Sequence, residues 1–105
     1  MEITYSKKGC KKVFKTYKHQ VATIQKAVAA QLTQQFATNF AKTKLATRIP
    51  VAGTKCYECR VNPPQLPAVR VAFTRHGADA TVEYLTTNIT KADFTQELEQ
   101  FLGGK

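Results

Sequence analysis

The sequence has few acidic residues, an odd number of cysteines and no long apolar run. Because three cysteines cannot all pair, Cys10, Cys56 and Cys59 cannot form a complete disulfide framework, and we expect reduced, buried thiols. No apolar run approaches the length that spans a bilayer, and no signal peptide precedes the first expected strand. These absences predict a soluble, cytoplasmic protein without a membrane partner.

The acidic residues that are present lie almost entirely in the second half of the chain. Residues 1–55 carry eleven Lys and Arg but a single acid, Glu2, which gives a net charge of +10, whereas residues 56–105 have a net charge of −1. Such a positive field in one half favours contact with a polyanion. The expected RNA-binding cations are Lys7, Lys8, Lys11, Lys12, Lys15, Lys18, Lys42, Lys44 and Arg48.

Length and composition indicate one folded domain over residues 1–105. A chain of 105 residues can bury a modest core, and its hydrophobic content of 43% argues against global disorder. The sequence contains neither an internal repeat nor a low-complexity segment.

Alternating apolar and polar residues predict three consecutive strands. In residues 56–62, and again in residues 69–74 after a proline-rich loop, apolar side chains occupy every second position. These apolar side chains should face the core, so Arg60 and Arg70 should project from the other face. A third run, residues 80–87, is rich in β-branched and aromatic residues, and the short turn before it favours an antiparallel meander.

Strand and helix signals also occur in the basic half. Residues 2–5 alternate as a short strand, and Ser6 is a suitable N-cap for a first helix whose apolar residues recur at helical spacing as far as Tyr17. Gly9 is the weak point of this helix. A second helix is expected from about His19 to Gln34.

The end of the chain predicts a third helix, from about Lys91 to Leu102. Thr90 and Asp93 resemble a capping box at its start, and two glycines end the run. Phe94 and Leu98 belong to an apolar stripe that should pack on the rest of the domain.

The expected order is therefore strand, two helices, a basic loop over residues 41–54, three strands and a helix. The N-terminal strand must pair with the meander, because it would otherwise be left alone. This predicts an α+β fold with a small antiparallel sheet, made of the N-terminal strand plus a three-strand meander. The helical hairpin covers one sheet face and a helix ends the chain. Arg60 and Arg70 should line the other, partly open face.

Four short strings carry a resemblance to a known family. They are Lys-Leu at 44–45, Cys-Tyr-Glu-Cys-Arg-Val at 56–61, Val-Arg-Val-Ala-Phe at 69–73 and Val-Glu-Tyr-Leu at 82–85. With these strings and its element order, most of the chain resembles the RelE/ParE superfamily of bacterial toxins from type II toxin-antitoxin systems. In such toxins a basic residue of the second strand and an arginine of the third contact the scissile phosphate. Arg60 and Arg70 occupy the matching positions.

The resemblance implies cleavage of messenger RNA in the ribosomal decoding site, without a cofactor. A ribose 2′-hydroxyl attacks the adjacent phosphate, which requires a base, cations for the added negative charge and an acid for the leaving 5′-oxygen. Arginine suits the second task because its planar fork can hold two phosphate oxygens. The implied partners are the ribosome, messenger RNA and an acidic antitoxin.

Three further residues are candidates for proton transfer. Glu58 has the same strand parity as Arg60 and could act as a base, and His76 could reach the groove from its turn. Lys91 lies where family members commonly place an additional basic residue. Phe94 follows, where the family often has a tyrosine, and Phe94 cannot transfer a proton.

Each candidate also has a purely structural interpretation. Glu58 and Glu83 could form surface ion pairs with Arg60 and Arg70 across the sheet, and His76 could be a solvated turn histidine.

The cysteine spacing also has a structural interpretation. Cys56 and Cys59 match the C-x-x-C pattern, but residues three apart on a strand point to opposite faces, so no metal site is expected.

Three functions remain open from the sequence. The first is a toxin that is a ribosome-dependent messenger RNA endonuclease. The second is a non-catalytic member of the same fold that binds RNA or inhibits a protein target such as DNA gyrase. Phe94 favours this second function, because it cannot transfer a proton. The third is a degenerate mobile-element protein that retains only the fold and an interaction surface.

Overall fold

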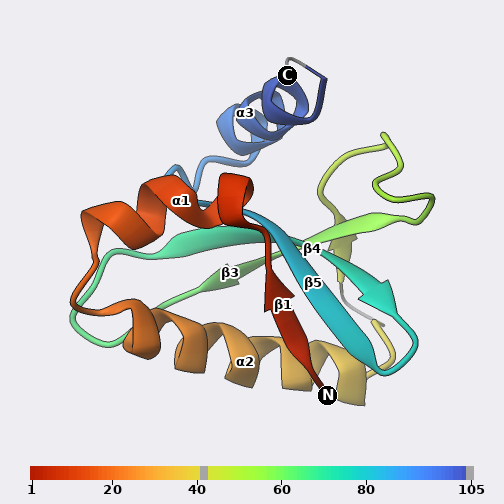
Figure 1. The fold of residues 1–105 in the computed structure, drawn as a ribbon. Coiled ribbons are helices and arrows are strands. Elements are labelled where there is room, and N and C mark those ends of the chain that lie inside the picture. The colour runs from red at the N-terminus through yellow and green to blue at the C-terminus, as the bar shows by residue number, and fades with distance from the viewer. Residues whose placement is uncertain (41–42, 104–105) are drawn as a thin grey trace.

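The computed structural model describes residues 1–40 and 43–103 (Figure 1). Its elements in chain order are β1 (Ile3–Tyr5), α1 (Lys7–Thr16), α2 (Val21–Ala37), β2 (Lys44–Leu45), β3 (Cys56–Val61), β4 (Val69–His76), β5 (Asp79–Thr86) and α3 (Lys91–Gly103). The α+β fold expected from the sequence is confirmed. Across the part of the chain described, no helix combines the length and apolar character that crossing a membrane requires.

The strands form one mixed sheet in the order β1-β5-β4-β3-β2. The antiparallel meander of β3, β4 and β5 is confirmed, and β1 pairs with the meander as expected, although in parallel with β5. The prediction of four strands missed β2, which pairs with β3 inside the stretch expected to be a loop. Two residues are too few for an alternating pattern, so pairing with β3, rather than local sequence, defines this strand.

One hydrophobic core joins α1 and α2 to a face of the sheet. Val13 of α1 and Val28 of α2 are buried in this core with Phe73 and Val82 from the strands. The alternation expected for residues 69–74 is confirmed, because Val69, Val71 and Phe73 of β4 all belong to this core.

A second, smaller core lies under α3, on the opposite side of the sheet from α2 (Figure 1). Phe94 and Leu98 of α3 are fully buried there with Cys56 and Ala72. The first turn of the helix lies beside polar residues of β3, because Lys91 forms an ion pair with Glu58, whereas Arg60 of the same strand is exposed.

Gly9 has a role that the sequence did not indicate. It is buried, and a Cβ atom at this position would lie 1.8 Å from the carbonyl oxygen of Glu83 on β5. Helix propensity makes glycine unfavourable inside α1, but the close approach of helix and strand requires it. The side chain of Ser6 accepts a hydrogen bond from the Gly9 amide, which confirms Ser6 as the N-cap.

α2 begins and ends a few residues later than expected from the sequence. It begins at Val21 and continues to Ala37, whereas a helix from about His19 to Gln34 was expected. The chain then leaves the helix through Asn39 and Phe40, whose φ angles are 52° and 62°.

Candidate functional site

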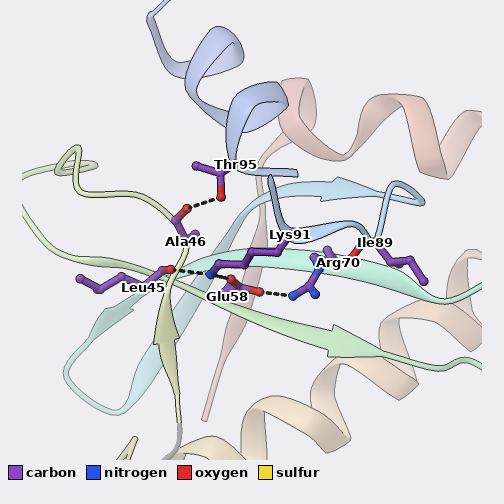
Figure 2. A network of polar contacts seen from close by, with 7 residues as sticks. All are labelled: Leu45, Ala46, Glu58, Arg70, Ile89, Lys91 and Thr95. Atoms are coloured by element: carbon purple, nitrogen blue, oxygen red, sulfur yellow. Dashed lines mark hydrogen bonds and ion pairs between the residues drawn. The ribbon is translucent and has the colours of Figure 1, made fainter. Parts of the chain in front are cut away.

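The partly open sheet face holds a buried carboxylate between two cations. Glu58 is 5% exposed, and its two carboxylate oxygens form separate ion pairs, one with Arg70 of β4 and one with Lys91 at the start of α3 (Figure 2). A buried charge is tolerated only when it is paired and hydrogen-bonded. The cluster of Glu58, Arg70 and Lys91 therefore depends on three elements that meet here, β3, β4 and α3.

Arg70 is fixed in orientation by its neighbours. Its Nη1 donates to Glu58, and its Nε donates to the carbonyl oxygen of Ile89 at 2.6 Å, in the loop before α3 (Figure 2). Its guanidinium carbon lies 5.9 Å from the ring centroid of the buried Phe94. The side chain is 18% exposed, so the guanidinium is positioned by protein groups yet still reaches solvent. Such preorganisation suits binding of a phosphate.

Lys91 connects the cluster to the edge of the sheet. Its Nζ donates to Glu58 and, at 3.2 Å, to the carbonyl oxygen of Leu45 on β2. Burial lowers the pKa of Lys91, and the positive charge of Lys44 lowers it further. Lys44 is near because it is the register partner of Glu58 across β2 and β3.

Arg60 lies directly opposite Arg70 in the register of β3 and β4. Two like charges at opposed positions repel unless an anion lies between or beside them. Within residues 1–40 and 43–103, the only ion pairs are the two made by Glu58, so Arg60 has no acidic partner there. Arg60 is exposed, and the cluster therefore presents an uncompensated cation next to Arg70.

The structure does not bring His76 to this cluster. His76 is at the far end of β4, six residues from Arg70, or about 20 Å along an extended strand. Its Nε2 lies 3.0 Å from the hydroxyl of Thr74, which donates to Glu83 at 2.7 Å. Of the two acids that the sequence offered as ion-pair partners for the arginines, Glu58 pairs with Arg70, whereas Glu83 accepts a hydrogen bond from Thr74.

The lysines of α1 form a separate basic surface. Lys7, Lys8, Lys11 and Lys15 surround the half-buried Phe14. Lys12 lines a small pocket with Thr86, which is the register partner of Arg70 on β5. Lys18 is exposed just beyond the helix.

The three remaining expected cations, Lys42, Lys44 and Arg48, belong to residues 41–54. Lys44 and Arg48 line a groove together with Lys91. Lys42 lies outside the described residues.

The three cysteines are buried free thiols. Cys56 lies in the core under α3 and Cys59 in the core of α1 and α2, so the expectation that they point to opposite faces is confirmed. Burial raises the pKa of Cys10, Cys56 and Cys59 to about 12. These thiols are therefore poor nucleophiles and poor metal ligands at neutral pH.

Sequence reasoning missed the groups that hold the cations in place. The carbonyl oxygens of Ile89 and Leu45 are backbone atoms, and every residue has such an atom, so the residue type gives no signal for these contacts. The sequence predicted that Phe94 packs on the rest of the domain, but it did not indicate that the ring lies beneath the guanidinium of Arg70.

Comparison of the chain with protein-family models, with curated proteins and with solved structures gives no match. The function therefore has to be inferred from the geometry of the site.

Proposed function

We propose that this protein is a RelE/ParE-like toxin of a type II toxin-antitoxin system, and that it cleaves messenger RNA on the ribosome. The substrate in this proposal is a phosphodiester, and Arg60 and Arg70 hold its non-bridging oxygens. The reaction is attack of a ribose 2′-oxygen on the adjacent phosphorus with departure of the 5′-oxygen.

The observation that carries the proposal is the opposed pair of arginines. Arg60 has no acidic partner in the described residues, and Arg70 is held in place by Glu58 and Ile89. An anion bound between the two guanidinium groups would remove their mutual repulsion. Two arginine forks stabilise the extra negative charge of a pentacovalent phosphorane better than that of the ground-state diester.

The same cluster contains groups for both proton transfers. In the proposal, Glu58 accepts the proton of the attacking 2′-hydroxyl, and the Lys91 ammonium donates a proton to the leaving 5′-oxygen. The lowered pKa of Lys91 favours this second transfer, because burial and Lys44 destabilise its protonated form. No cofactor or metal is needed for this chemistry.

The partners in this proposal are messenger RNA, the ribosome and an acidic antitoxin, all in the cytoplasm. The exposed lysines of α1 provide a basic surface for ribosomal RNA, since each contact with a phosphate releases counterions.

One observation favours a second candidate function, a non-catalytic protein of this fold. The Glu58 side chain is only 3% exposed, and both its oxygens are already paired. A carboxylate in that position would have to exchange a partner before it could take a proton from RNA. In this alternative Glu58 anchors α3 to the sheet, and the cationic surface binds RNA or a protein target such as DNA gyrase without cleaving anything.

Induced expression with transcript end mapping separates the two functions. The proposal predicts cuts in translated regions that are phased with codons, and their loss in the Arg60→Ala variant. Arg75→Ala is the matched control, because Arg75 is an exposed arginine near the far end of β4. Growth arrest and DNA damage with intact transcripts would instead support the non-catalytic candidate. Cuts that persist equally in both variants would refute the assignment of Arg60.

A further inference from the structure

Three residues along one side of α3 contact three consecutive residues of the segment that begins with β2. In chain order, the hydrogen bonds join Lys91 to the Leu45 carbonyl, Thr95 to the Ala46 carbonyl, and Glu99 to the Thr47 hydroxyl (Figure 2). Their donor–acceptor distances are 3.2, 3.4 and 2.7 Å. Because residues four apart lie on the same side of a helix, the three contacts follow α3 and the segment in step. We call these three hydrogen bonds the α3 clamp.

The α3 clamp also fixes the chain just beyond β2. The Thr47 residue is only 6% exposed, and its hydroxyl accepts from the Ile49 amide at 3.1 Å while it donates to Glu99. β2 itself has two residues and is the edge of the sheet, so the sheet alone holds it by few hydrogen bonds. The contacts with α3 therefore add to the order of residues 44–49.

Lys44 is the cation that this arrangement holds beside the arginines. It is the register partner of Glu58, so both side chains lie on the sheet face that carries Arg60 and Arg70. Arg60 is two residues beyond Glu58, which makes it a diagonal neighbour of Lys44 at a distance of about 7–8 Å across the sheet. The charge of Lys44 also lowers the pKa of Lys91, which agrees with this placement.

Lys44 and Arg60 are both available to a ligand. Both are exposed, and neither has an acidic partner within residues 1–40 and 43–103, where both ion pairs belong to Glu58. Successive phosphates of a nucleic-acid strand are separated by a distance comparable to that between these two cations. A strand with one phosphate between the arginines can therefore bring the next phosphate to Lys44, and lysine binds phosphate as a point charge.

We propose that Lys44 binds the phosphate next to the one held by Arg60 and Arg70. Thr95 and Glu99 are positioning residues that keep Lys44 in place through the α3 clamp. This inference rests on the RNA substrate of the proposed function but not on its cleavage, since it concerns binding alone. Two neighbouring phosphate contacts fix the register of the strand across β3 and β2, so α3 helps to set where the RNA lies.

The test compares two ligands that cannot be cleaved, a 2′-O-methyl dinucleotide with one phosphate and a 2′-O-methyl trinucleotide with two. Each is titrated into the full-length protein at low salt, and amide chemical shifts report its affinity and position. Lys44→Gln should weaken trinucleotide binding about threefold to fivefold, the effect of one exposed ion pair. It should leave dinucleotide binding unchanged. Lys26→Gln, at an exposed position of α2, is the matched control and should affect neither ligand.

Two double variants test the positioning residues. Thr95→Val with Glu99→Ala removes two contacts of the clamp but keeps Lys44 and both arginines. This variant should weaken trinucleotide binding as Lys44→Gln does, leave dinucleotide binding unchanged, and speed hydrogen exchange of the Ile49 amide. Thr95→Ser with Glu99→Gln keeps a hydroxyl and an acceptor oxygen at the same positions. It should therefore restore both the affinity and the slow exchange.

The proposal is overturned if Lys44→Gln weakens both ligands equally or neither, or if the dinucleotide does not bind. An Ile49 amide that exchanges equally fast in the wild type and in the valine–alanine variant would refute the role of the clamp. These outcomes are distinct from a failure of the proposed cleavage. A protein that shows the expected binding but leaves ribosome-bound messenger RNA intact would support this inference and refute only the cleavage.

Discussion

Replacing Glu58 with glutamine tests whether one buried carboxylate holds the site together. The substitution keeps the side-chain volume but removes the charge that compensates Arg70 and Lys91. Breaking a buried ion pair by removing one partner costs on the order of 3–5 kcal/mol, because the other charge is left uncompensated. Lys91 is 47% exposed, so water replaces most of its lost interaction, and its share is at most about 1 kcal/mol.

Most of the loss should therefore come from Arg70, whose side chain is 18% exposed. The amide oxygen of glutamine can still accept one hydrogen bond from Arg70, which returns roughly 1 kcal/mol. We expect Glu58→Gln to destabilise the protein by about 2–3 kcal/mol. For a domain of this size that loss lowers the melting temperature by roughly 8–20 °C.

Thermal and urea unfolding followed by circular dichroism measure this loss. Glu2→Gln is the matched control, because Glu2 is exposed and its loss should change stability by less than about 0.5 kcal/mol. In a double-mutant cycle with Arg70→Met, the effects of Glu58→Gln and Arg70→Met should not add, with a coupling energy of about 1–3 kcal/mol. Additive effects, or a Glu58→Gln protein as stable as the wild type, would refute the reasoning.

Three other predictions concern different parts of the molecule. Gly9→Ala should destabilise the protein by roughly 1–3 kcal/mol in urea unfolding, because its Cβ would collide with the backbone of β5. Gly103→Ala, at the open end of α3, is the control and should be nearly neutral. A Gly9→Ala protein as stable as the wild type would contradict the packing of α1 on β5. The thiols, whose pKa values are raised to about 12, should react slowly with a disulfide reagent at pH 8 in the folded protein and rapidly after unfolding. Fast reaction in the native state would show that they are accessible. The affinity of the protein for RNA should fall steeply as the salt concentration rises, and should drop further when Lys11 and Lys12 are changed to glutamate. Binding that is independent of salt would exclude the basic surface of α1 as the RNA-binding site.

The parts of the fold that follow from local pattern could be predicted from the sequence. Alternation located β3 and β4, the β-branched and aromatic residues located β5, and the capping signal at Ser6 located the start of α1. The two-residue strand β2 and the requirement for Gly9 could not be predicted. Both depend on contacts between segments distant in sequence, which local periodicity does not record.

The candidate site divides in the same way. Strand parity placed Glu58, Arg60 and Arg70 on one face, because side chains two residues apart on a strand share a face. Parity fixes the face but not the position along the strand, so the separation of His76 from Arg70 follows only from the length and register of β4. The carbonyl groups that orient Arg70 and Lys91 depend on how α3 docks, and the sequence has no signal for them.

The cleavage rate of Arg70 variants on ribosome-bound messenger RNA tests the central claim most directly. If Arg70 holds the scissile phosphate, Arg70→Ala should lose on the order of 3 kcal/mol of transition-state stabilisation, which is roughly a hundredfold in rate. Arg70→Lys keeps the charge but not the fork, so it should recover only part of the activity while both variants remain folded. Folded Arg70→Ala and Arg70→Lys proteins that cleave as fast as the wild type would contradict phosphate chemistry at this face of the sheet.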